Sequence, residues 1–278
     1  PARAAATSPL ALTANGAGVA AGSRPGVHVE FDHVWFAYAG EQWVLEDVSF
    51  AIEPGERVAV VGATGSGKTT LTSLLLRFYT PQRGEIRVDG RPLAQWDAAV
   101  LRRRIGLVLQ DVFLFSGTVE SNLTLGDPDV SPELARTAAT EVHADAVVAR
   151  LPGGYAGQVR ERGATLSAGE KQLLAFARTL ARDPELLVLD EATSSVDTHT
   201  ERLIQSALRR LLAGRTSLVI AHRLSTIRDV QRIVVLHHGR IRETGSHAEL
   251  LALRGLYHRL VQLQYLGSPA APPASVSP

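Results

Sequence analysis

The sequence contains no cysteine, which excludes disulfides and thiolate metal sites. It also lacks any apolar run near the roughly 18 residues that span a bilayer, so we expect a membrane role to depend on another chain or segment. The net charge is only +1, which gives no indication of nucleic acid or an acidic membrane surface as a partner. With 45% hydrophobic and 21% charged residues over 278 positions, the composition is typical of a soluble globular protein.

The two ends of the chain differ in composition from the middle. Pro1–Gly26 is rich in Ala, Gly, Ser and Thr and lacks the charged start and apolar core of a signal peptide, so it predicts a flexible linker. Gly267–Pro278 predicts a disordered tail for the same reason. Between them, residues 27–266 are within the range of one large α/β domain.

Short apolar runs in this middle part predict strands. Four runs are solid rather than alternating, which favours a mostly parallel sheet buried on both faces: Arg57–Val61, Ile105–Leu109, Leu186–Leu189 and Ser217–Ala221. Val27–Phe31 and Val34–Tyr38 alternate in part and predict two half-buried strands. Val112–Leu180 is richer in helix formers and predicts a helical subdomain inserted into the core. A capping box at Ser246–Glu249 predicts a last helix from about His247 to Gln264.

Residues 62–69, Gly-Ala-Thr-Gly-Ser-Gly-Lys-Thr, match the phosphate-loop pattern G-x-x-x-x-G-K-[ST] in full. The strand before them and a predicted helix Lys68–Phe78 after them give the context that the pattern requires. Glycines let amides turn toward phosphate oxygens, and the helix N-terminus adds its positive dipole end. We expect Lys68 to reach the β- and γ-phosphates and Thr69 to coordinate Mg²⁺. The expected nucleotide-binding residues here are Gly62, Thr64, Gly65, Ser66, Gly67, Lys68, Thr69 and Thr70.

Two acidic residues, Asp190 and Glu191, end the run Leu186–Leu189. In open α/β sheets, ligands bind at the carboxyl ends of strands. We expect Asp190 to hold Mg²⁺ through water, and Glu191 to orient and deprotonate an attacking water as general base. The alternative is a solvated acidic turn, which the four aliphatic residues before the pair disfavour.

The segment Leu166-Ser-Ala-Gly-Glu170 resembles the signature of ABC ATPases, usually Leu-Ser-Gly-Gly-Gln, and it precedes a predicted helix Lys171–Leu180. Other elements follow in the order of that family. They are the adenine-stacking aromatic Tyr38, the Q-loop glutamine Gln110, the D-loop Ser194–Asp197 and the switch histidine His222. Tyr38 alone is also compatible with a core aromatic. Together the elements resemble the nucleotide-binding domain of an ABC transporter over Val27–Gln264.

The resemblance implies a P-loop NTPase core with a RecA-like, mostly parallel sheet, an antiparallel β subdomain and a helical subdomain at about 112–180. It implies that two such domains pair head to tail, with ATP between one phosphate loop and the partner's signature residues Ser167 and Gly169. ATP binding joins the domains and hydrolysis separates them. In this picture Gln110 senses Mg²⁺ and the attacking water, His222 contacts the γ-phosphate, and Asp197 belongs to the nucleotide site.

Two segments indicate the exporter type. Residues 110–119, QDVFLFSGTV, look like the exporter stretch that receives the coupling helices of a membrane domain. The alternative is that its apolar cluster Val112–Phe115 simply belongs to the core of the helical subdomain. Arg160–Gly163 lies where exporters carry Gly-Glu-Arg-Gly, although Gln158 and Arg160 stand where the usual residues are Glu and Gly. We therefore expect a membrane domain to contact residues 110–119 and 158–163 at the cytoplasmic face of the membrane.

Two other classes are less favoured by the sequence. A soluble ABC ATPase acting on DNA or ribosomes usually carries coiled coils, zinc motifs or a basic linker, and the sequence has none of these, so no nucleic-acid partner is expected. A non-catalytic ABC module does not need the base Glu191. The adjacent His237 and His238 indicate a hairpin approach to Gly239 rather than a metal pair, since neighbours in a strand point to opposite faces.

The signature departs from the family pattern at two positions, whereas the phosphate loop, Asp190, Glu191 and His222 follow it. Ala168 adds a methyl group where backbone approaches phosphate, and Glu170 brings a carboxylate near an anion unless it points away. A division between a complete and an impaired site is typical of heterodimeric exporters. We therefore expect the second nucleotide-binding domain to come from a different subunit, with a homodimer as the alternative.

Overall fold

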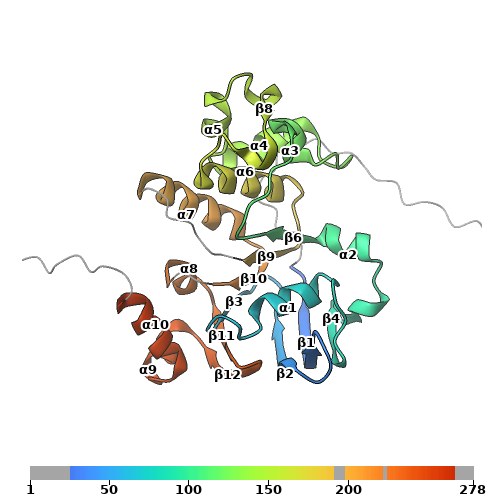
Figure 1. Ribbon diagram of the computed structural model, residues 1–278, viewed down its shortest axis with the longest axis vertical. Helices are drawn as coiled ribbons and strands as arrows, with labels where there is room; N and C mark the ends of the chain where they lie inside the picture. Colours follow the sequence, from blue (N-terminus) through green and yellow to red (C-terminus); the bar gives the residue numbers. More distant parts are fainter. Residues whose placement is uncertain (1–25, 191–197, 222–223, 267–278) are drawn as a thin grey trace, which may run out of the picture.

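The computed structural model describes residues 26–190, 198–221 and 224–266. A six-stranded sheet in the order β12-β11-β3-β10-β9-β6 forms its centre, and all neighbours are parallel except the pair β11–β12 (Figure 1). Its strands are β3 (Arg57–Val61), β6 (Ile105–Val108), β9 (Leu186–Asp190), β10 (Thr216–Ile220), β11 (Arg232–His237) and β12 (Arg240–Gly245). The four solid runs are thus strands, as predicted, to within one residue at each end.

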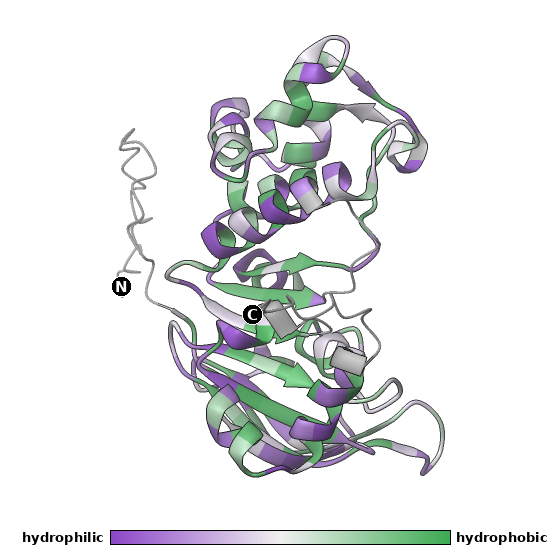
Figure 2. Ribbon diagram, turned by 90° about the vertical axis from the view of Figure 1, so that its left-hand side faces the viewer, coloured by the Kyte–Doolittle hydropathy of each residue, from purple (hydrophilic) through white to green (hydrophobic). Residues whose placement is uncertain are grey.

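Alternate residues of the central strands enter different cores. Val58 and Val60 pack in a cluster with α1 and the antiparallel sheet, whereas Ala59 and Val61 pack with the helices on the opposite face. All four are at most 4% exposed. The hydropathy colouring of Figure 2 shows the same apolar centre. The absence of polar alternation in the sequence therefore reflects burial on both faces of the sheet.

A second sheet, in the order β2-β1-β4-β5, is antiparallel and consists of β1 (Val29–Ala37), β2 (Trp43–Ile52), β4 (Arg83–Val88) and β5 (Arg91–Pro92). The prediction of two strands in its first part was wrong, because β1 is continuous. The register shifts between Phe31 and Val34, where His33 has a positive φ of 49°. A bulge therefore disturbs the alternation without ending the strand.

The helices are α1 (Lys68–Leu75), α2 (Ala98–Arg104), α3 (Val119–Thr124), α4 (Pro132–Glu141), α5 (Asp145–Arg150), α6 (Ala168–Ala181), α7 (Thr198–Leu212), α8 (Leu224–Arg228), α9 (His247–Ala252) and α10 (Leu256–Leu266). Short 3-10 turns lie at Leu93–Gln95, Gly154–Ala156 and Glu161–Gly163, and β7 (Gly117–Thr118) pairs with β8 (Gln158–Val159). Helices α3–α6 gather at one end of the molecule (Figure 1). Within the described ranges, no helix is long and apolar enough to cross a bilayer.

The predicted single helix at the C-terminal end is in fact two helices. Its capping box is present at Ser246 and Glu249, but α9 ends at Ala252 and α10 begins at Leu256. Arg254 between them has a positive φ of 52°. The Glu243 carboxylate accepts hydrogen bonds from the amides of Leu256 and Tyr257, the latter at 3.0 Å, and so caps the second helix from β12. Gly255 at this break is a local signal that the prediction passed over, whereas the cap comes from Glu243, 13 residues before Leu256.

Candidate functional site

The backbone of the loop between β3 and α1 forms a cradle, and residues from other elements pack closely against it. An added Cβ on Gly62 would lie 2.2 Å from the Leu236 carbonyl oxygen, and one on Gly67 would lie 2.6 Å from Leu45 Cδ2. Gly65 has open space around it, but its φ of +79° disfavours a side chain. The Ser66 carbonyl accepts from the Gly239 amide at 3.2 Å, which fixes the loop to the β11–β12 turn. Packing behind the loop therefore requires Gly62 and Gly67 before any ligand is considered.

Lys68 and Ser66 present polar groups to this cradle. The Lys68 side chain is 6% exposed, and its amine donates to the carbonyls of Gly62 at 2.8 Å and Ala63 at 3.0 Å. Burial lowers the pKa of the Lys68 amine, and the nearby charge of Asp190 opposes that shift. The buried Ser66 hydroxyl has no hydrogen-bond partner in the described part of the chain. A buried cation, an unused hydroxyl and a helix N-terminus together fit an anionic phosphate.

Candidate oxygen donors for a cation come from the first turn of α1 and from the carboxyl ends of β9 and β6. Asp190 ends β9, and its charge acts on Lys68. Gln110 follows β6, which pairs with β9, so both residues come from the carboxyl ends of neighbouring strands. Thr69 and Gln110 are exposed. A hydroxyl, a carboxylate and an amide oxygen suit Mg²⁺. No group of three or more His, Asp or Glu that could hold a metal occurs within residues 26–190, 198–221 and 224–266.

Tyr38 lies at the end of β1 with an exposed fraction of 54%, so it is not a core aromatic. Its hydroxyl is 3.1 Å from the hydroxyl of buried Thr70 on α1. The rings of Phe36 and Tyr79 meet it edge to face, with centroids at 4.9 and 5.2 Å. This platform offers an aromatic face next to the phosphate cradle. Sequence reasoning missed Tyr79, whose only signal is the aromatic pair that follows the loop helix.

The signature segment forms the N-terminus of α6. Ser167 accepts from the Glu170 amide at 3.2 Å, and the Glu170 carboxylate accepts from the Ser167 amide at 2.9 Å, which completes a capping box. The other carboxylate oxygen of Glu170 accepts from Arg150 at 2.9 Å. Gly169 is buried in the first turn. Among described residues, no hydrogen bond or ion pair joins this helix start to the phosphate loop.

Three predicted site residues, Glu191, Asp197 and His222, lie outside the described residues. Thr64 is exposed on the phosphate loop.

The two histidines His237 and His238 do form a turn into Gly239, but the expectation that their side chains point to opposite faces was wrong. His238 has a φ of 47°, and the two rings lie 4.2 Å apart.

The two segments expected to meet a membrane domain are brought together. Gly117 pairs with Val159, and Thr118 with Gln158, as the short sheet β7–β8. Within the apolar cluster, Leu114 is fully buried, as the core alternative required, whereas Phe113 and Phe115 are 46% and 53% exposed. Their rings meet edge to face at 4.9 Å. The cluster therefore combines one anchoring residue with an exposed aromatic pair.

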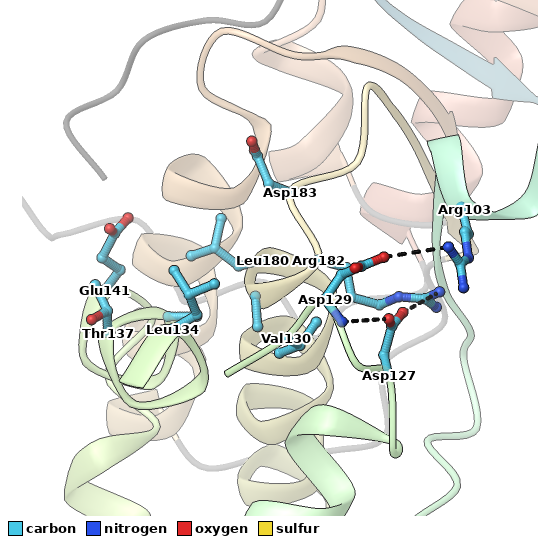
Figure 3. Close-up of a pocket in the computed structure, with 12 residues that line it drawn as sticks. Arg103, Asp127, Asp129, Val130, Leu134, Thr137, Glu141, Leu180, Arg182 and Asp183 are labelled. Carbon is cyan, nitrogen blue, oxygen red and sulfur yellow. Dashed lines mark hydrogen bonds and ion pairs between the residues drawn. The ribbon is translucent and has the colours of Figure 1, made fainter. Parts of the chain in front are cut away.

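A cavity of about 530 Å³ opens elsewhere, between α4, the end of α6 and the loop after α3 (Figure 3). Two ion pairs cross its rim, Arg103–Asp129 at 3.3 Å and Arg182–Asp127 at 3.1 Å. Its floor is apolar, with Val130, Leu134 and Leu180. None of the predicted nucleotide-binding residues lines it, so this cavity is separate from the cradle described above.

The strand, glycine loop and helix around Lys68, at the carboxyl end of an inner strand of a mostly parallel sheet, define a P-loop NTPase. The ABC transporter family model matches residues 45–194, and the chain belongs to that family as an ATP-binding domain of the ABC ATPase type. Over 237 residues it is 50% identical to the uncharacterized ABC transporter ATP-binding protein YknV of Bacillus subtilis (strain 168), with 85% of this chain and 39% of the relative covered.

Other relatives and a solved structure agree. The ATP-dependent lipid A-core flippase of Legionella pneumophila (strain Paris) is 48% identical, over 86% of this chain and 41% of the flippase. A bacterial Atm1-family ABC exporter with ATP bound matches with a TM-score of 0.81 and 42% identity, over 89% of this chain and 43% of the exporter. The chain thus spans about two fifths of the length of the relatives it matches.

Proposed function

We propose that this chain is the ATP-hydrolysing domain of an ABC exporter and that it works as one half of a head-to-tail pair. The observation that carries the proposal is that the helices α1 and α6 each begin with an N-terminus suited to an anion. No hydrogen bond or ion pair joins these two N-termini within the part of the chain that the structure describes. Each end can serve a phosphate, and a second domain supplies the missing half. The named relatives and the Atm1-family exporter support this reading by similarity.

Within this site the chain's residues have distinct tasks. Lys68 and the loop amides hold the phosphates, and Tyr38 receives the adenine. Thr69, Gln110 and Asp190 would hold Mg²⁺, which neutralises charge on the phosphates when bound. Glu191 takes the proton of the attacking water, and His222 and Asp197 complete the nucleotide side. Ser167 and Gly169 serve the nucleotide of the partner domain.

The membrane side of the proposal rests on the aromatic pair. Phe113 and Phe115 expose two rings on a loop that Leu114 anchors. This loop leads into β7, which pairs with β8 at residues 158–159. An exposed aromatic patch of this kind is typical of a protein contact. We propose that a membrane domain docks here, which places the chain at the cytoplasmic face of the membrane, with residues 27–266 as one domain and about 112–180 as its inserted helical part.

The composite site is tested by dilution. ATPase activity per molecule of this chain is expected to rise with protein concentration, while the ATP affinity measured on the dilute monomer stays constant. Turnover is followed over at least a hundredfold range of concentration, with the oligomeric state measured in parallel by light scattering. Activity per molecule that remains flat in a verified monomer would contradict the pairing.

We further propose that the partner domain belongs to a different subunit. Ala168 and the departures at Gln158 and Arg160 support this proposal, whereas Glu170 does not, because its carboxylate is turned back onto Ser167 and Arg150. The partner is then expected to carry Leu-Ser-Gly-Gly-Gln and to lack the catalytic glutamate. A full-length homodimer of this chain with robust transport would rule the heterodimer out and leave the ATPase proposal intact.

A further inference from the structure

Arg178 on α6 is a partly buried cation whose hydrogen-bond partners are neutral. Its Nε donates to the Asn122 carbonyl at 2.8 Å, and its terminal nitrogens donate to the Phe113 carbonyl at 3.0 Å and to Asn122 Oδ1 at 3.3 Å. Burial lowers the pKa of the guanidinium to about 10, so it remains charged at neutral pH. No ion pair of Arg178 occurs within the ranges that the structure describes. Even partial burial of a charge without a counter-charge is costly, so filling space alone does not explain an arginine here.

Asn122 extends this grip to the loop before α3. It is 1% exposed, and its amide nitrogen donates to the carbonyls of Phe115 at 2.8 Å and Thr118 at 3.0 Å. Its side-chain oxygen accepts from the Phe115 amide at 2.8 Å. Every hydrogen-bonding group of the Asn122 side chain is therefore committed either to Arg178 or to the loop backbone. We call these two residues the Arg178–Asn122 clamp.

The clamp holds the backbone of the exposed aromatic pair Phe113 and Phe115. Leu114 between them is fully buried, and it lies close to Gly163 and so to the segment that leads into the signature. Helix α6 begins at the capping residue Ser167 and carries Arg178 three turns later. One helix thus bears the signature at its start and binds the aromatic loop near its end.

We propose that the Arg178–Asn122 clamp makes α6 and the Phe113–Phe115 pair move as one body, so that a partner docked on the aromatic rings shifts the signature helix. This inference rests on the proposed function, in which a membrane domain docks on that pair. Arg178 is a positioning residue, because it acts through the loop backbone and not on a nucleotide. Because the guanidinium is charged at neutral pH, it holds the loop carbonyls in place. Among the described residues it has no carboxylate partner with which it could pair instead.

The first test uses the chain itself and hydrogen–deuterium exchange. Arg178→Lys keeps the charge but cannot bridge three oxygens, so amides 113–118 are expected to exchange about tenfold faster while the amides of α6 are unchanged. Arg215→Lys is the matched control, because Arg215 is also largely buried and donates to the Leu211 carbonyl and Asp183 outside this loop. Unchanged exchange at 113–118 in a folded Arg178→Lys protein would overturn the clamp.

The second test uses the complete transporter and the ratio of substrate-stimulated to unstimulated ATPase activity. Arg178→Lys is expected to lower this ratio about threefold or more, with unstimulated activity retained. If Arg178→Lys does not fold, Asn122→Asp replaces it, since it gives Arg178 a carboxylate and removes both amide donors to the loop. Stimulation equal to wild type in the folded variant would overturn the inference.

A double variant, Phe113→Ala with Phe115→Ala, separates a failure of docking on the aromatic pair from a failure of the clamp. If it abolishes stimulation while Arg178→Lys leaves stimulation intact, docking stands and the clamp fails. If the double variant leaves stimulation intact, the docking proposal fails, and the clamp loses its role in coupling. If both variants lower stimulation and the Arg215→Lys control does not, the clamp transmits the contact.

Discussion

The start of α1 and the start of α6 are both helix N-termini that the family uses for phosphate, yet they are built differently. The cap of α1 is Gly67 with a φ of 106°, no side chain caps it, and its first turn has no acidic residue. The cap of α6 is Ser167, which forms a capping box with Glu170. The first helix leaves its amides open for a ligand, whereas the second partly satisfies its own donors.

This difference indicates which half of the site is committed. At α1, a buried ammonium and an unpaired hydroxyl are costly without an anion, so the loop is organised around a ligand. At α6 the serine and glutamate stabilise the helix whether or not a phosphate is present. We infer that the α1 half binds ATP on its own and that the α6 half is recruited only when a second domain arrives.

The largest expected effect breaks the chemistry of the α1 half. Glu191→Gln removes the base but not the phosphate contacts, so hydrolysis is expected to slow by about two orders of magnitude or more, with ATP binding nearly intact. It should also trap a nucleotide-bound pair, because the release step is blocked. Steady-state turnover, ATP affinity and the oligomeric state with ATP are measured on the same preparation. Turnover near wild type would exclude Glu191 as the base.

The second prediction breaks binding at α1. Lys68→Met removes a buried cation that would contact phosphate, so ATP affinity of the monomer is expected to fall about 10- to 100-fold, the loss of a charge-assisted hydrogen bond. Isothermal titration measures the affinity. The free energy of unfolding without nucleotide should stay within about 1 kcal/mol, because an apolar chain of similar length replaces a buried charge. An unchanged affinity would remove Lys68 from the phosphate site.

The elements that the sequence predicts well are those whose signals are local. The solid runs of β3 and β9, the glycine loop and the capping box at Ser246 need only near neighbours in the chain. The capping box of Ser167 and Glu170 has the same local pattern but was not predicted, and α6 begins at Ala168 rather than at Lys171. The bulge at His33 and the cap of α10 involve contacts with residues of other strands, Asp47 and Glu243, both 14 residues away in the chain, which the apolar pattern does not report. Arg178 was missed for the same reason. A single arginine in an apolar helix gives no hint of the loop carbonyls that it binds.

The third prediction tests the α6 half alone. Ser167→Ala should cost about 1 kcal/mol of stability through the lost cap. In pairs that this chain forms with itself, where Ser167 serves a site with a catalytic glutamate, it should also lower ATPase activity about tenfold. ATP affinity of the dilute monomer should not change. Ser246→Ala is the matched control, since Ser246 and Glu249 form the same capping box on α9. The control should lose similar stability in chemical denaturation with no loss of activity. If the dilute Ser167→Ala monomer loses as much ATP affinity as the paired protein loses activity, Ser167 serves its own chain's nucleotide and not the partner's.

The smallest expected effect decides whether the carboxylate in the signature matters. Glutamine also serves in a capping box, so Glu170→Gln should leave the cap of α6 in place. It weakens only the ion pair with Arg150, whose side chain is 68% exposed, and such surface pairs contribute little to stability. If the carboxylate stays turned toward Ser167 and Arg150, ATPase activity should remain within about twofold of wild type. Adding Ala168→Gly should alter activity of the native complex only modestly.

The control is Glu249→Gln on α9, which makes the same change in a capping box far from any nucleotide. A several-fold rise in activity for Glu170→Gln alone would mean that the charge does face the partner's phosphate. Such a rise would also mean that this signature serves a hydrolysing site, which contradicts a partner subunit without the catalytic glutamate.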